Sequence, residues 1–108
     1  MTPSKRKGTT FEVAVRDHLD GAGVAAFRTA PAGARDEGDL LVLDWDAILE
    51  CKATKAIDLA GAVDEARIEA HHAHRRFGIA VIKRRMASIG KAYVVMELDA
   101  FVDLMKKP

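Results

Sequence analysis

The chain has 108 residues, of which 49% are hydrophobic, and its charged side chains nearly cancel to a net charge of +1. A chain of this size can bury one core and has no room for a second, so we predict a single domain over residues 1–108. No apolar run is long enough to cross a membrane, and the basic start leads into an amphipathic segment rather than a signal peptide. The lone Cys51 cannot form an internal disulfide and is expected to be a buried hydrophobe in a reducing cytoplasm.

The first predicted element is a helix over residues 11–20, in which apolar side chains recur at every fourth position. Residues 1–8 are basic and are expected to form a flexible arm ahead of this helix. Gly21 or Gly23 is expected to end it, because glycine readily adopts the left-handed conformation that closes helices. A strand over 24–28 follows.

A polar, irregular stretch over 29–38 then leads to two short apolar runs at 40–43 and 47–49. Both runs have the length and composition of strands, and residues 44–46 between them have the composition of a turn. The two strands are expected to pair as a hairpin, which brings their outer ends together.

A long helix is predicted from residue 57 or 58 to 77, with a face of small residues that lets it lie close to a sheet and Gly78 as its end. Strands over 79–82 and 92–96 follow, and their continuous apolar character predicts burial on both faces. A last helix over 100–105 is expected to be capped by the aspartate before it. The order α-β-β-β-α-β-β-α indicates an α/β fold with a mixed five-stranded sheet flanked by helices.

The hairpin carries the most informative side chains of the sequence. Because side chains alternate along a strand, Glu50 and Lys52 point to one face, and pairing brings Asp39 back beside them. Two carboxylates, with the backbone carbonyl of Cys51, form the oxygen ligand set that Mg²⁺ prefers, and Mn²⁺ is expected to substitute. Such a metal activates water and neutralises phosphate charge, while Lys52 orients or deprotonates the attacking water. A solvated acidic loop remains the alternative.

On these residues the sequence resembles the PD-(D/E)XK nuclease superfamily. Its signature is an acid at the start of one strand and Glu/Asp-x-Lys on the next, matched here by Asp39 and Glu50-Cys51-Lys52. The proline that precedes the first acid in the family is Gly38 in this chain. The resemblance implies a core like that of restriction endonucleases and assigns catalysis to the acids and the lysine.

A second resemblance lies at the start of the predicted first helix. Lys7-Gly8-Thr9-Thr10-Phe11-Glu12 is similar to the opening of the archaeal and phage Holliday junction resolvases, in which a glutamate of the first helix completes the metal site. The resemblance therefore assigns a metal-binding and catalytic role to Glu12. The arginine that follows in the family is Val13 here, and Arg16 lies one turn later in its place. A capping box between Thr9 and Glu12 is the structural alternative.

Basic side chains lie on both sides of this acidic centre, as a metal-dependent nuclease requires for holding phosphates. No acid occurs between Ala70 and Met96, a range that includes His71, His72 and His74. These histidines are expected to extend the basic face rather than to bind zinc, because no cysteine or acid lies one turn away to complete a site. We predict DNA contacts from Lys5, Arg6, Lys7, Arg28, Arg35, Lys83, Arg84 and Arg85.

A chain with little beyond a catalytic core has little surface for reading base sequence, so recognition of DNA shape is expected. Two symmetric nicks across a four-way junction call for a C2 homodimer. The sequence thus predicts a Mg²⁺-dependent, structure-selective endonuclease of the Holliday junction resolvase type, in the cytoplasm of a bacterial or phage-infected cell. The alternatives are a repair nuclease of the same fold that acts on flaps, nicks or single strands, and a catalytically silent nucleic-acid binding module.

Overall fold

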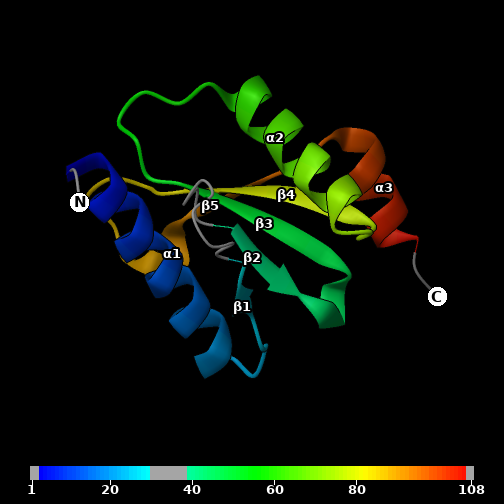
Figure 1. The fold of residues 1–108 in the computed structure, drawn as a ribbon, viewed down its shortest axis with the longest axis horizontal. Helices are drawn as coiled ribbons and strands as arrows, with labels where there is room; N and C mark the ends of the chain where they lie inside the picture. The colour runs from blue at the N-terminus through cyan, green and yellow to red at the C-terminus, as the bar shows by residue number, and fades with distance from the viewer. Residues whose placement is uncertain (1–2, 30–38, 107–108) are drawn as a thin grey trace.

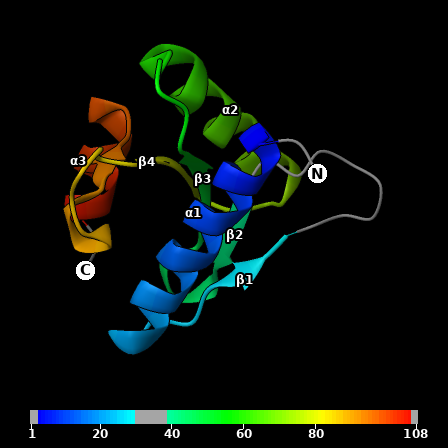
Figure 2. The same cartoon turned by 90° about the vertical axis from the view of Figure 1, so that its left-hand side faces the viewer.

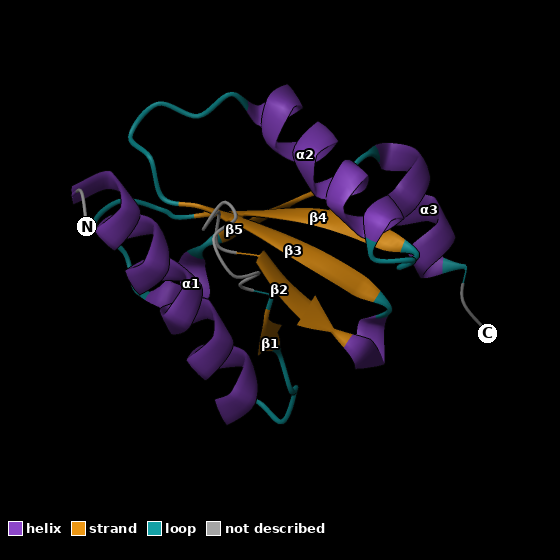
Figure 3. Cartoon of the chain, in the orientation of Figure 1, coloured by secondary structure: helices purple, strands orange, loops and turns teal. Residues whose placement is uncertain are grey.

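The computed structural model describes residues 3–29 and 39–106, with the backbone alone at residues 3–9 and at Asp39. These residues form three α-helices and a mixed five-stranded sheet, in the predicted order (Figure 1, Figure 3). No helix among them is both long and apolar enough to span a bilayer. The elements are α1 (Pro3–Gly21), β1 (Phe27–Arg28), β2 (Asp39–Val42), the 3-10 turn η1 (Leu43–Trp45), β3 (Ala47–Lys52), α2 (Leu59–His72), β4 (Phe77–Ile82), the 3-10 turn η2 (Ile89–Lys91), β5 (Tyr93–Val95) and α3 (Leu98–Met105).

The strands lie in the sheet in their sequence order, β1-β2-β3-β4-β5. β2 and β3 form the predicted antiparallel hairpin, closed by η1 and by Asp46 in the left-handed conformation, with φ 51°. β3 and β4 are parallel, and α2 makes the crossover that a parallel pair requires. The parallel pairing brings the carboxyl ends of β3 and β4 to one end of the sheet.

Two helices cover opposite faces of this sheet (Figure 2). α1 packs Phe11 and Val15 against one face, where Cys51 is also buried, as predicted. α2 packs small side chains, among them Ala66, against the other face, which also carries Glu50. Alternation along β3 therefore puts Ala47, Leu49 and Cys51 under α1, and puts its two charged residues on the α2 side.

Gly78 was predicted to end the second helix, but it lies in β4 beneath that helix. A β-carbon at Gly78 would collide with the backbone carbonyl of Ala66 on α2. The missing side chain therefore lets the helix backbone approach the strand closely. Close approach of another backbone is a common reason for glycine inside a strand.

α2 ends at His72 because its last turn closes in a Schellman arrangement. The Arg75 N–H donates to the Ala70 carbonyl at 2.8 Å, and the His74 N–H donates to the His71 carbonyl at 3.1 Å. His74 occupies the left-handed position, with φ 56°, where glycine is usual. The predicted extension of the helix to residue 77 was wrong because the stop signal is carried by a histidine.

The first helix starts earlier than predicted. α1 begins at Pro3, so residues 3–8, expected as an arm, are helical, and Glu12 lies in the third turn. A capping box between Thr9 and Glu12 is therefore excluded, because both residues lie inside the helix. Its end was predicted correctly: the helix stops at Gly21, and Gly23 follows with φ 88°.

The edge strands and the last helix also differ from the prediction. β1 has only two residues, and β5 is an exposed edge strand rather than one buried on both faces, whereas β4 is buried throughout, as predicted. α3 begins at Leu98 with Glu97 at its N-cap, so the aspartate expected as the cap lies in the first turn.

Candidate active site

β3 brings Glu50 and Lys52 together on the α2 face. The Lys52 ammonium lies 3.1 Å from a Glu50 carboxylate oxygen, and the Glu50 side chain is fully buried. A buried carboxylate is costly unless a cation or hydrogen-bond donors compensate it, so the ion pair stabilises this arrangement. The predicted side-by-side placement of the two residues is therefore confirmed.

Asp39 lies directly opposite Glu50 in the antiparallel register of β2 and β3. Directly opposed residues of an antiparallel pair lie about 5 Å apart, so the backbone brings the predicted acids together. The side chain of Asp39 lies outside the described part of the chain. Its role as a ligand stays a prediction, as does that of the Cys51 carbonyl.

Glu65 on α2 contributes a second carboxylate, 3.1 Å from the Lys52 ammonium. Partial burial lowers the pKa of Lys52, but its hydrogen bonds to Glu65 and Glu50 and the charges of both carboxylates outweigh burial and raise the pKa above its ordinary value. Lys52 is therefore an ammonium at neutral pH, held between two acids. This contact is not predictable from the sequence, because the register of a helix against a sheet is a tertiary property.

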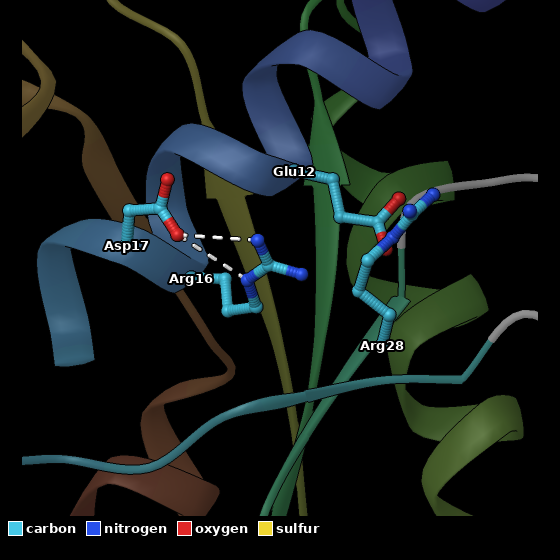
Figure 4. A network of polar contacts seen from close by, with 4 residues as sticks. All are labelled: Glu12, Arg16, Asp17 and Arg28. Atoms are coloured by element: carbon cyan, nitrogen blue, oxygen red, sulfur yellow. Dashed lines mark hydrogen bonds and ion pairs between the residues drawn. The ribbon is translucent and has the colours of Figure 1, made fainter.

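Glu12 of α1 is also buried, with 3% of its surface exposed, and accepts a hydrogen bond from the Arg28 guanidinium at 2.7 Å (Figure 4). Arg28, predicted to contact DNA, is therefore engaged by Glu12 in this structure. Arg16, which the resemblance put in place of a missing arginine, bonds the neighbouring Asp17 at the surface. A metal-binding role for Glu12 stays a prediction.

The basic segment after β4 begins beside the candidate site. The Lys83 N–H donates to the Lys52 carbonyl at 2.9 Å, which fixes the start of this segment at the carboxyl end of β3. Lys83, Arg84 and Arg85 are all exposed. Exposed basic side chains and the buried carboxylate thus share one end of the sheet, an arrangement with no local signal in the sequence.

The other predicted basic residues lie elsewhere in the chain. The backbone of residues 5–7 forms part of the first turns of α1, at the same end of the sheet (Figure 1, Figure 2), but their side chains lie outside the described part. Arg35 lies outside it altogether. The histidines, expected to extend a basic face with Arg75 and Arg76, close α2 at the opposite end, where Arg75 bonds Asp46 at 3.5 Å, so they lie apart from Lys83.

Comparisons with protein-family models, with curated proteins and with solved structures found no match. Function is therefore argued from the site alone. Within the described side chains, no three of the types His, Cys, Asp and Glu gather closely enough to hold a metal. A metal site at this end of the sheet needs Asp39 beside Glu50, and carboxylate oxygens of this kind suit Mg²⁺.

Proposed function

We propose that this protein is a Mg²⁺-dependent, structure-selective DNA endonuclease that cleaves four-way junctions as a homodimer, built on a core like that of restriction endonucleases and acting in the cytoplasm. The observation that carries the proposal is the pairing of the buried Glu50 with Lys52, with Asp39 opposite Glu50 in the register. Burying a carboxylate is costly, so a fully buried Glu50 paired with Lys52 favours a functional site over a merely polar strand end.

In this proposal, the site residues have separate tasks. Asp39, Glu50 and the Cys51 carbonyl would hold Mg²⁺, which supplies an activated water and neutralises charge on the phosphate. Lys52 is protonated, so it donates hydrogen bonds that orient the water or a phosphate oxygen. Lys52 was predicted either to orient or to deprotonate the attacking water, and this charge state favours orienting it.

The exposed segment Lys83–Arg85 would hold the DNA backbone next to the site. Because its first amide bonds the Lys52 carbonyl, a phosphate bound there is kept close to the reacting group. Contacts of this kind carry no base information, which suits an enzyme that recognises shape.

The dimer is supported by an apolar stripe on α3. Leu98, Phe101, Val102 and Met105 are all exposed, and they lie on one side of the helix because Phe101 and Val102 are three and four residues from Leu98, and Met105 three and four residues from them. Two copies of α3 packed antiparallel across a twofold axis would cover both stripes, and would place Lys106 of one copy near Glu97 of the other. Figure 1 shows α3 beside the start of β4, away from the candidate site, so a dimer of this form leaves both sites open.

The test is incubation of the pure protein with a labelled four-way junction or a linear duplex, in Mg²⁺ or EDTA. We expect cleavage of the junction in Mg²⁺ alone. Asp39→Asn and Glu50→Gln should each abolish cleavage and leave junction binding at or above the wild-type level, because removing a carboxylate also removes repulsion of phosphate. Cleavage above about a hundredth of the wild-type rate in both variants would remove these residues from the site.

Two outcomes would replace the proposal. Preference for flaps, nicks or single strands over junctions would indicate a repair nuclease with the same chemistry. Binding of DNA without cleavage under any metal would indicate a nucleic-acid binding module, in which the acids are structural.

A further inference from the structure

The loop after β4 carries the most exposed large hydrophobic side chain among the described residues. Met86 is 99% exposed, although methionine gains free energy when it is buried. It follows directly after Lys83, Arg84 and Arg85, in a turn that leads to η2. Packing within the chain therefore does not account for a methionine at this position.

The backbone at Met86 gives the same indication. Its φ of 57° lies in the left-handed region, where side chains other than those of glycine and asparagine are disfavoured. A glycine or an asparagine would fit this turn with less strain and would expose no apolar surface. Folding thus gives no advantage to methionine here.

The surroundings of Met86 fit contact with DNA. Three exposed basic residues precede it, and the Arg84 guanidinium lies 5.9 Å from the ring centroid of Tyr93 on β5, which is itself half exposed. The start of the loop is bonded to the Lys52 carbonyl at 2.9 Å, so Met86 is three residues from a fixed point at the candidate site. A DNA backbone held by these cations would lie next to the methionine side chain.

We propose that Met86 is a wedge that enters the base stack of duplex DNA at the branch point. The inference rests on the proposed function and adds to it the element that recognises the substrate. Proteins that bend DNA insert methionine and other apolar side chains between base steps, flanked by arginine and lysine on the phosphates. The cost of unstacking is lowest where pairing or stacking is already interrupted, so such a wedge favours a junction over a continuous duplex.

The test uses the full chain, in EDTA to prevent cleavage, with synthetic four-way junctions that carry 2-aminopurine either at the branch point or in the middle of one arm. Binding of the wild type should raise fluorescence at the branch point and not in the arm. Met86→Ala should lose most of this rise and bind the junction about tenfold more weakly, a loss of about 1.4 kcal/mol, with duplex affinity changed less than about twofold.

Two variants serve as matched controls. Met86→Leu keeps the apolar bulk and should keep both the fluorescence rise and the affinity. Ile68→Ala removes an exposed apolar side chain from α2 and should behave as the wild type. Because Met86 is exposed, none of its variants should change the circular dichroism spectrum or the melting temperature by much.

The wedge would be refuted if Met86→Ala kept the fluorescence rise, if it weakened junction and duplex binding equally, or if Met86→Leu lost the rise as well. These results would leave the nuclease proposal standing, since cleavage in Mg²⁺ is measured separately. A wild-type protein that neither binds nor cuts a junction would instead refute the proposed function, and the wedge with it.

Discussion

Replacing Lys52 with alanine tests the candidate site most directly, because this side chain contacts two acids and is assigned a role in the reaction. Two unit charges 3.1 Å apart interact by about 5 kcal/mol at an effective dielectric constant of 20. The free-energy cost of removing the Lys52 ammonium from water offsets much of this attraction. Glu65 is nearly half exposed, so its own pair with Lys52 contributes at most about 1 kcal/mol.

Most of the stability lost in Lys52→Ala should therefore come from the buried Glu50, and we expect a loss of about 1–3 kcal/mol. For a domain of this size, that loss lowers the melting temperature by roughly 5–15 °C, so the variant stays folded at 25 °C. Circular dichroism melting curves measure this change. Glu65→Gln is the matched variant and should lower stability by less than about 1 kcal/mol.

The cleavage rate of Lys52→Ala, measured in single turnover with enzyme in excess, should fall on the order of a hundredfold or more, as for the loss of a positioned polar group. Lys55→Ala, a change of an exposed lysine three residues later, should cleave at nearly the wild-type rate. Equal losses in the two variants would show that general electrostatics explains both, and the specific role of Lys52 would be refuted.

Three further predictions concern DNA binding, assembly and packing. Replacing Arg84 or Arg85 with alanine should weaken binding to all DNA sequences alike. In fluorescence anisotropy, the slope of log K against log salt should flatten by about 0.9 for each phosphate that the variant no longer neutralises. An unchanged slope would remove that residue from the interface. Phe101→Glu should convert the proposed dimer to a monomer in analytical ultracentrifugation without unfolding the protein, because Phe101 is partly exposed on α3. A dimer that survives this change would place the interface elsewhere. Gly78→Ala should destabilise the fold by about 3 kcal/mol in urea unfolding, because the added methyl group meets the Ala66 carbonyl, whereas Gly21→Ala, which meets nothing, should be neutral or stabilising.

Local chemistry was sufficient to predict most of the architecture. Apolar runs of strand length, separated by Asp44-Trp45-Asp46, specify the hairpin, and the register that follows puts Asp39 opposite Glu50. Alternation along β3 then separates Cys51 from Glu50 and Lys52. These features depend on residues close in sequence, so no knowledge of the remaining fold was needed.

Predictions failed where distant contacts decide local structure. Gly78 looked like a helix stop, but its missing side chain serves the approach of Ala66, while His74 ends the helix in a conformation usually left to glycine. Apolar β5 looked like a central strand, yet no further described strand pairs with its outer edge. In each case the sequence gives the residue type, but the structural role of the residue depends on its neighbours in the fold.

The order of the elements and the placement of Asp39 opposite Glu50 follow from short-range periodicity, so they can be read from the sequence. That Glu65 shares Lys52 with Glu50, that Arg28 bonds Glu12, and that the segment after β4 starts at the Lys52 carbonyl is seen only in the folded protein. These contacts join elements whose relative placement is set by packing on the two faces of the sheet, and packing depends on the whole core at once.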